Sequence, residues 1–492
     1  MTVPTKVLVA NRGEIAARII GTLDRLGLDS VAIYHALDGD SRAVRAAGEA
    51  VEVRGDTPVG AYLDIAAIVA VCQATGADAV HPGFGFLSEN ADFAEAVIAA
   101  GITWIGPPPA AMRAMGDKIT SKRLAVEAGV PTLPGSEGAL ADAQEAIAVA
   151  ATTGYPVLVK ASADGGGKGM RIAHDDGELR EAFTRASAEA AAAFGDGRVF
   201  VERFIERPRH IEIQVLADAH GTVLHPGERE CSIQRRYQKV IEESPSPFVD
   251  AAMRRAMGET AVALARAVGY ISAGTVEMIV DEDGGFYFLE MNTRLQVEHP
   301  VTELVTGIDI VAEQVRIAGG EPLAFAQDDV ALSGHAIECR IYAEDADAGF
   351  VPATGRLRLV RFPAGDGVRV DHGVLEGQEV SAAFDPMIAK VAVHAPTRAE
   401  AIQTGRRALR ETVLLGTVTN TAFLERVLSH PAFARGETYT DFLDAHAEEL
   451  AGPALDADGE RFLIAAAALA SSKFDPRLAA PEPLAAMGPW SP

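Results

Sequence analysis

The sequence predicts a multidomain protein of mixed α/β and α+β class. A chain of 492 residues is too long for one hydrophobic core, so about two to four structural units are expected. Apolar residues make up 48% and charged residues 23%, which is ordinary for a soluble globular protein. Buried-type strands alternate with helices near the N-terminus, and strand-rich segments follow later. This order predicts a parallel-sheet domain followed by domains of mixed architecture.

The first predicted domain, residues 1–115, is a parallel α/β unit. Residues 7–10 are typical of a buried strand, apolar side chains then recur at helical spacing from Ile15, and residues 31–34 form the next strand. Only Gly13 lies in the first turn, so the three-glycine fingerprint of dinucleotide-binding domains is absent. We therefore expect no nicotinamide or flavin site.

The rest of the chain divides into four further segments. Residues 131–205 predict a small domain with a strand at 157–160, a glycine-rich loop, an Ala-rich helix and a second strand. Residues 206–330 are richer in strands, and residues 331–448 predict a mixed α/β domain. Residues 449–492 are rich in Ala and Pro and predict a linker with one helical stretch.

Charge and cysteine content exclude several classes of protein. The net charge of -25 argues against nucleic acid or an anionic membrane as a partner, since both need a basic surface. Three widely spaced cysteines, Cys72, Cys231 and Cys339, give neither a disulfide framework nor a zinc spacing, so a cytoplasmic location is expected. The sequence contains no signal-peptide pattern and no run of about 18 apolar residues, so no membrane span is expected.

A hairpin of two acidic strands is the first candidate site. Residues 281–285 separate two apolar runs, and Asp-Gly between such runs is a strong hairpin signal. A two-residue turn at 283–284 places Glu277 opposite Glu290, with Asn292 on the same face. Opposed like charges destabilise a sheet unless a cation lies between them, and these oxygen donors suit Mg²⁺ or Mn²⁺. The alternative is a solvated acidic hairpin without function.

A glycine-rich loop is the second candidate. Gly165, Gly166 and Gly167 follow the strand that ends at Lys160, and consecutive glycines let backbone N–H groups surround phosphate oxygens. The order differs from the P-loop, because Lys168 is followed by glycine. The alternative is a flexible hairpin tip. Lys118 and His210 would not be assigned a function from spacing alone.

The loop after the hairpin is the third candidate. Arg294 and Gln296 alternate with Glu298, and the Val297 N–H lies between them. An Arg fork, an amide and a backbone N–H suit a small planar oxyanion such as a carboxylate or bicarbonate. Glu298 would be the base in reach, and a neighbouring anion is expected to raise its pKa. The alternative is a surface loop of paired charges, worth about 0–1 kcal/mol.

Taken together, these motifs resemble biotin carboxylase, the ATP-grasp component of biotin-dependent carboxylases. The resemblance runs from about residue 5 to residue 448, and so many motifs in one order are highly specific. The motifs are residues 10–16, 81–90, 115–118, 164–170, 209–214, 231–236, 290–300 and 338–341.

The resemblance implies a fold and a set of roles. The fold would be a Rossmann-like pre-ATP-grasp domain, an ATP-grasp fold whose mobile glycine-loop lid closes over ATP, and a C-terminal mixed α/β domain. ATP would be bound by Lys118, Lys160, Gly165, Gly166, Gly167 and His210, with Glu202 and Ile205 near the adenine. Magnesium or manganese would be bound by Glu277, Glu290 and Asn292. Bicarbonate would be held by Lys239, Arg294, Gln296 and Val297, with Glu298 as the base, and Arg340 would stabilise the enolate-like form of biotin.

Two positions depart from the family pattern. The family often has His where Tyr237 stands, so that position is given no catalytic role. A homodimer is expected, although Gly21 stands where some relatives place an Arg in a dimer contact.

The resulting hypothesis is ATP-dependent carboxylation of biotin. Glu298 would deprotonate bicarbonate, which attacks the γ-phosphate to give carboxyphosphate; this splits into CO₂ and phosphate, the phosphate takes a biotin proton, and biotin N1′ attacks CO₂. The alternatives are another ATP-grasp ligase that joins an acyl phosphate to an amine, and a catalytically silent nucleotide-binding scaffold.

The resemblance also implies partners. A biotin-accepting Lys usually lies between two Met residues, and Lys473, the only Lys of the tail, does not. We therefore expect a biotin carboxyl carrier on a separate protein or on a domain beyond residue 492, together with a carboxyltransferase subunit. The final acceptor stays open among acetyl-, propionyl-, longer acyl- and methylcrotonyl-CoA and urea.

Overall fold

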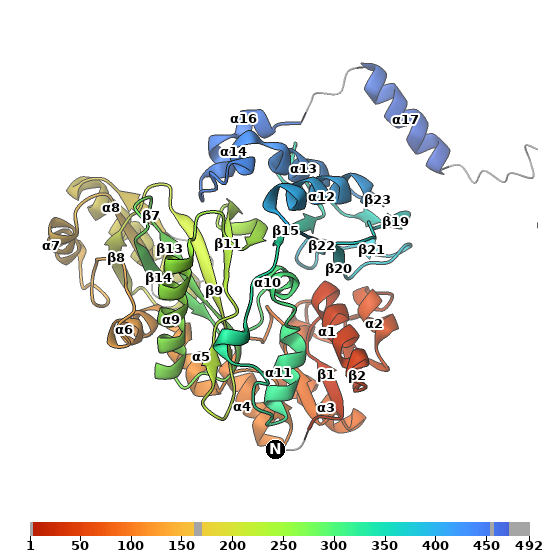
Figure 1. Ribbon diagram of the computed structural model, residues 1–492, viewed down its shortest axis with the longest axis horizontal. Coiled ribbons are helices and arrows are strands. Elements are labelled where there is room, and N and C mark those ends of the chain that lie inside the picture. Colours follow the sequence, from red (N-terminus) through yellow and green to blue (C-terminus); the bar gives the residue numbers. More distant parts are fainter. Residues whose placement is uncertain (1–2, 162–169, 453–456, 472–492) are drawn as a thin grey trace, which may run out of the picture. The chain divides into compact units, whose positions relative to one another are not determined.

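The N-terminal residues form a five-stranded parallel sheet with helices on both faces (Figure 1), as the sequence predicts. The strand order is β3-β2-β1-β4-β5. Alternate residues of the first strand enter two different cores: Val7 and Val9 pack in one, and Leu8 in the other. The strands are β1 (Lys6–Val9), β2 (Asp29–Tyr34), β3 (Glu49–Glu52), β4 (Ala79–His81) and β5 (Thr103–Trp104). The helices are α1 (Gly13–Arg25), α2 (Arg42–Ala46), α3 (Ile65–Thr75) and α4 (Ala91–Ala99), with the short turns η1 (Ala36–Asp38) and η2 (Gly60–Tyr62).

This computed structural model describes residues 3–161, 170–452 and 457–471. Residues 1–450 form one compact unit and residues 451–492 a second. The predicted phosphate-loop glycines Gly165, Gly166 and Gly167 lie outside the described residues, as does Lys473.

A small three-stranded antiparallel sheet, in the order β7-β6-β8, follows two helices that lead out of the N-terminal sheet. Two helices cover it, and together they enclose a separate core that includes Val157, Leu179 and Val201. The strands are β6 (Val157–Ala161), β7 (Arg171–Ala173) and β8 (Val199–Arg203). The helices of this region are α5 (Pro109–Gly116), α6 (Lys118–Glu127), α7 (Ala143–Thr153) and α8 (Asp176–Phe194).

The largest sheet has nine strands and carries most of the candidate site. Its order is β14-β13-β9-β11-β12-β15-β22-β20, with β10 added at β9. Its strands are β9 (Arg209–Ala217), β10 (Val223–Leu224), β11 (Glu228–Arg235), β12 (Gln238–Ser244), β13 (Ser272–Val280), β14 (Phe286–Asn292), β15 (His335–Tyr342), β20 (Val368–His372) and β22 (Met387–Ala395). Because β12 pairs antiparallel with β15, hydrogen bonds run directly from the segment 206–330 into the segment 331–448.

Helices cover this sheet along its length. α9 packs on β9, α10 packs on β12, β15 and β22, and α12 packs on β15 and β22. The helices are α9 (Ala251–Ala267), α10 (His299–Thr306), α11 (Ile310–Ala318), α12 (Arg398–Glu411), α13 (Thr421–Ser429), α14 (Pro431–Ala434), α15 (Phe442–Ala445) and α16 (Ala447–Leu450), with the turn η3 (Gln327–Asp329). Small two-stranded sheets pair β16 (Glu344–Asp345) with β17 (Val351–Pro352), β18 (Gly355–Arg356) with β21 (Glu379–Val380), and β19 (Leu359–Arg361) with β23 (Val413–Leu415).

The hairpin β13–β14 has the predicted pairing but not the predicted turn. Glu277 lies opposite Glu290, as expected. The turn, however, is closed by the backbone pair Asp281 and Gly285, so it is one residue longer than predicted. A β-bulge between Glu277 and Met278 takes up the extra residue. The predicted pairing of Glu277 with Glu290 is therefore correct because the longer turn and the bulge offset each other.

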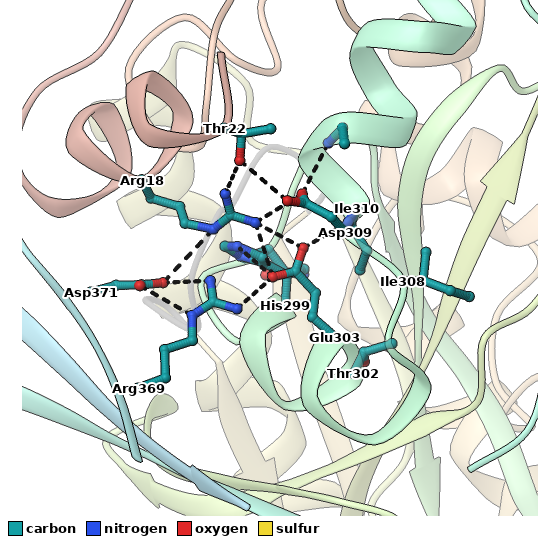
Figure 2. A network of polar contacts seen from close by, with 12 residues as sticks. Arg18, Thr22, His299, Thr302, Glu303, Ile308, Asp309, Ile310, Arg369 and Asp371 are labelled. Carbon is teal, nitrogen blue, oxygen red and sulfur yellow. Dashed lines mark hydrogen bonds and ion pairs between the residues drawn. The ribbon is translucent and has the colours of Figure 1, made fainter. Parts of the chain in front are cut away.

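A polar network ties the N-terminal domain to the rest of the first unit (Figure 2). Arg18 of α1 contacts Glu303 of α10 and Asp309, both at 3.0 Å. Arg369 of β20 contacts Glu303 at 2.6 Å and Asp371 at 2.8 Å. The Arg18 and Glu303 side chains are each only 6% exposed, so these pairs are shielded from solvent and fix α1 against α10 and β20.

In the second unit, the described helix α17 (Ala457–Ser471) contains the helical stretch that the tail predicts. Among the helices that the structure describes, none is both long and apolar enough to cross a membrane.

Candidate active site

The side chain of Lys239 lies among three carboxylates. Its Nζ is 2.5 Å from Glu212, 2.7 Å from Glu277 and 2.6 Å from Glu298. Lys239 is brought there by the tight turn between β11 and β12, in which Arg236 and Tyr237 both have a left-handed backbone, at φ 49° and 67°. Burial alone would lower the pKa of Lys239, but the three carboxylates raise it well above its ordinary value. Lys239 is therefore a permanent cation in this site.

Sheet register explains why these acids meet. Glu277 on β13 lies between Glu212 on β9 and Glu290 on β14, so three carboxylates stand in a row across adjacent strands. Arg229, which is fully buried, hydrogen-bonds to Glu212. Such a row of like charges would be unstable without Lys239 and Arg229. Glu212 had no predicted role. Glu212 and His210 are two residues apart in a predicted strand, however, and this spacing could have placed both on the same face of the sheet.

The predicted metal ligands lie at one end of this row. Glu277 Oε1 accepts hydrogen bonds from Asn292 Nδ2 at 2.8 Å and Gln296 Nε2 at 3.1 Å, and its Oε2 lies 2.9 Å from His210 Nε2. The described part of the chain provides no hydrogen bond to the Glu290 side chain. Burial and the charge of Glu277 raise the pKa of Glu290. A divalent cation between them would relieve that repulsion, so the oxygen donors fit Mg²⁺ or Mn²⁺.

The predicted anion-binding residues lie directly beside the predicted metal ligands. Arg294 contacts Gln296 Oε1 at 3.1 Å and Asn292 Oδ1 at 3.0 Å. Its Nε donates to Glu89 at 2.9 Å, and Glu89 also accepts from the Thr293 N–H at 3.2 Å. Glu89 belongs to the motif 81–90, so the N-terminal domain holds this loop. Glu89 had no predicted role, because its contact partner Arg294 lies 205 positions away in the chain.

Glu298 is held from both sides by cations. Its Oε1 accepts from Lys239, and its Oε2 accepts from Arg340 Nη2 at 3.0 Å. Burial would raise the pKa of Glu298, but Lys239, Arg340 and Arg229 together hold it well below its ordinary range. The expectation of a raised pKa was wrong, because it considered only the bound anion and not the three cations behind the carboxylate. Glu298 is therefore ionised at neutral pH.

Arg340 is itself fixed by an acid. Its Nε donates to Glu242 Oε1 at 2.5 Å. Glu242 and Glu338 lie directly opposite each other on β12 and β15, and both are fully buried. Burial and the neighbouring Glu242 raise the pKa of Glu338 well above its ordinary value, although Lys390 lowers it. Burial would lower the pKa of Arg340, but Glu242 and Glu298 raise it well above its ordinary value, so Arg340 stays positively charged beside Glu298.

A second cluster lies between α6 and the small sheet. Lys160 and Lys122 contact the two oxygens of Glu202 at 2.6 and 2.8 Å. Although burial opposes it, these lysines lower the pKa of Glu202 to about 2. Lys118 begins α6. Lys122 lies one turn further along this helix and had no predicted role. Ile205 is half-buried just beyond β8.

Most predicted site residues thus meet. One connected set of contacts joins His210, Lys239, Glu277, Asn292, Arg294, Gln296, Glu298 and Arg340. Lys118 acts electrostatically on Glu290 and so lies on the same side of the site. Lys160 and Glu202 form the separate cluster. Such an arrangement can hold a metal-bound phosphate at one end and a small anion beside a base at the other.

Family models match three consecutive parts of the chain. They are "Biotin carboxylase, N-terminal domain" over residues 3–112, "Carbamoyl-phosphate synthase L chain, ATP binding domain" over 117–326, and "Biotin carboxylase C-terminal domain" over 338–445.

Curated relatives agree with these matches. Biotin carboxylase of Halalkalibacterium halodurans is 51% identical over 442 residues, covering 90% of this chain and 97% of the relative. The propionyl-CoA carboxylase alpha chain of Ruegeria pomeroyi is 53% identical, covering 94% of this chain and 71% of the relative. The human mitochondrial propionyl-CoA carboxylase alpha chain is 51% identical, covering 95% and 64%. The chain thus spans about two thirds of the propionyl-CoA carboxylase alpha chains.

Solved structures are similar throughout. The biotin carboxylase domain dimer of Hydrogenobacter thermophilus 2-oxoglutarate carboxylase, in complex with MgADP, ADP and bicarbonate, has a TM-score of 0.89 and 45% identity, covering 92% of this chain and 100% of that one. A biotin carboxylase–ATP-analogue complex from Campylobacter jejuni has a TM-score of 0.87 and 42% identity, covering 90% and 99%.

Proposed function

The chain belongs to the biotin carboxylase family, and from this premise we propose that it carboxylates carrier-bound biotin with ATP and bicarbonate through carboxyphosphate. The observation that carries the proposal is the position of Glu298, a buried base held between Lys239 and Arg340. Arg294 and Gln296 stand on the same loop and supply the donors that a planar anion requires.

In the first step, bicarbonate binds to Arg294, Gln296 and the Val297 N–H. Glu298 is ionised and therefore takes the bicarbonate proton, while Lys239 stabilises the negative charge that remains on the substrate. A bicarbonate oxygen then attacks the γ-phosphorus of ATP, ADP leaves, and carboxyphosphate forms.

The nucleotide is bound on the side of the small domain. In this proposal, Lys118, Lys160, His210 and the glycines Gly165, Gly166 and Gly167 would bind the phosphates, and Glu202 and Ile205 would lie near the adenine. Mg²⁺ bound to Glu277, Glu290 and Asn292 would neutralise the charge on the transferring phosphoryl group. Lys239 and His210 already contact Glu277, so the phosphate and anion ends of the site share one carboxylate.

In the second step, carboxyphosphate splits into CO₂ and phosphate, the phosphate takes the N1′ proton of biotin, and N1′ attacks CO₂. Arg340 contacts Glu298 and in this proposal would stabilise the negative oxygen of deprotonated biotin. Glu242 orients the Arg340 fork for this role.

The partners follow from the family. We propose a biotin carboxyl carrier and a carboxyltransferase subunit, with a homodimer of this chain as in the Hydrogenobacter domain. Propionyl-CoA is the acceptor that the names of the relatives favour. A cytoplasmic location stays a prediction from the cysteine content.

The test is ADP release by the chain with free biotin and bicarbonate. ADP release should depend on both compounds. Other small carboxylates in place of bicarbonate separate this reaction from an acyl-phosphate ligase: turnover with one of them, and not with bicarbonate, would reject the proposal.

A further inference from the structure

A buried lysine lies directly behind the proposed bicarbonate site. Lys390 stands on β22 and its side chain is fully buried. Its Nζ donates to the carbonyl oxygen of Val297 at 2.6 Å. Val297 supplies the proposed bicarbonate-binding N–H and immediately precedes Glu298. A charged donor therefore fixes the backbone between the Val297 N–H and Glu298.

Acidic groups keep this lysine charged. Glu14 Oε1 lies 3.5 Å from its Nζ, and Asp371 lies opposite Lys390 in the pairing of β20 with β22. Burial lowers the pKa of Lys390, but Glu14, Glu338 and Asp371 together raise it above its ordinary value. The bond to Val297 is thus charge-assisted, which makes it stronger than a neutral hydrogen bond.

Glu14 belongs to the motif of residues 10–16, to which the proposed reaction assigns no role. It is buried at the start of α1, within residues 10–16, and neither of its oxygens has a hydrogen bond within the described chain. Arg18, one turn further along α1, is fixed by Glu303 and Asp309 (Figure 2). The network therefore fixes α1, the helix that carries Glu14, and Glu14 in turn lies beside Lys390.

We propose that Lys390, supported by Glu14, is a positioning residue that holds the Val297 peptide so that the Val297 N–H and the Glu298 carboxylate both face bicarbonate. This rests on the proposed function. Lys390 lies behind the loop, so its effect on bicarbonate passes through Val297. Nucleotide binding uses other strands and loops and should not depend on Lys390.

A small displacement of the Val297 peptide would be enough to impair the reaction. A base and its substrate must be held within about 0.5 Å and 10–20° of the productive geometry. Val297 is half-buried in the loop between β14 and α10, where the sheet ladder no longer fixes the backbone. Removing one strong bond there lets the peptide rotate, and a shift of about 1 Å can cost about a hundredfold in rate.

The test compares Lys390→Met with Lys390→Arg and Glu14→Gln. Methionine has a similar length but no charge, so KM for bicarbonate should rise about tenfold or more and kcat should fall, while KM for ATP stays within about twofold. Arginine keeps the charge and should restore part of the loss. Glu14→Gln should raise the same KM by a smaller factor. His335→Gln is the matched control, because His335 is a buried polar residue of the same sheet that contacts Glu243 and not the loop.

Each outcome decides one point. If the wild-type chain shows no bicarbonate-dependent ADP release, the proposed function fails. If the wild type is active and Lys390→Met changes both KM values equally, or only lowers the melting temperature as His335→Gln does, the positioning role is rejected. If Lys390→Met does not fold, Lys390→Arg and Glu14→Gln decide: unchanged KM for bicarbonate in both rejects the role.

Discussion

Lys239 places a single ammonium group among three carboxylates, and this balance sets the chemistry of the site. Because Lys239 and Arg340 keep Glu298 ionised, the proposed base carries its charge at any pH near neutrality. A carboxylate of low pKa is a weak base, so the same cations must also stabilise the deprotonated substrate. Binding and proton transfer therefore depend on the same two residues.

Replacing the base tests this view at the level of one residue. Glu298→Gln keeps the size of the side chain but removes its proton affinity, so turnover should fall about 10²–10⁴-fold. Nucleotide affinity, measured by calorimetry with ADP, should stay unchanged because Glu298 contacts no proposed nucleotide ligand. Unchanged turnover would exclude Glu298 as the base.

The metal site allows a second test. Glu290→Gln removes the charge that repels Glu277, so the apoprotein should lose no stability or gain slightly in urea unfolding. Activity should require a higher Mg²⁺ concentration, by about tenfold or more, because one of two anionic ligands is gone. Equal Mg²⁺ dependence of the variant and the wild type would show that Glu290 is not a ligand.

Particular residues show what sequence can and cannot predict. Glu277 and Glu290 were paired by counting along one hairpin, a local operation. The low pKa of Glu298 was missed because Arg340 and Arg229 come from strands 42 and 69 positions away. Glu212, Lys122, Glu89 and Lys390 were missed for the same reason: their partners become neighbours only after folding.

The turn between β11 and β12 is the element that positions Lys239 in the site. Arg236 and Tyr237 both occupy the left-handed region, which non-glycine residues adopt at a cost. The parallel N-terminal sheet and the β13–β14 hairpin were predictable, since their patterns are local. The bulge beside Met278 was not, because sequence alternation continues across it.

Tyr237 therefore gives a prediction for this turn. Its side chain is 59% exposed, so Tyr237→Gly should relieve backbone strain and stabilise the protein by about 1 kcal/mol. Tyr237→Val should destabilise it by about 1–2 kcal/mol, since a β-branched residue tolerates this region least. Urea unfolding of the two variants measures the difference; the opposite order would contradict the strain argument.

At the level of the whole molecule, the Arg18–Glu303–Arg369–Asp371 network holds three segments of the first unit together (Figure 2). One of its acids, Asp371, is stabilised in the charged form. Burial would raise the pKa of Asp371, but Arg369 and Lys390 lower it to about 2. The network is therefore sensitive to acid and insensitive to pH near neutrality.

The sign of this pH dependence follows from linkage. A carboxyl whose folded pKa of about 2 lies below its ordinary 3.8 stabilises the protein above pH 4, and this contribution is lost as the pH falls through 2. Asp371 should contribute about 2 kcal/mol. The free energy of unfolding, measured from pH 5 down to pH 2, should fall less steeply in Asp371→Asn than in the wild type. Identical slopes would contradict the assignment.

The continuous sheet through β12 and β15 has a consequence for protein engineering. The gene can be cut near residue 331, but the fold cannot. Glu298 and its partner Arg340 lie on opposite sides of that cut, and the hydrogen-bonded ladder between β12 and β15 crosses it. A chimera that exchanges residues 331–448 between relatives would exchange one partner of the Glu298–Arg340 ion pair as well. Such a hybrid should succeed only when Glu242, Arg340 and Lys390 come from compatible parents, so transplantation of this catalytic activity requires residues 1–450 as one block.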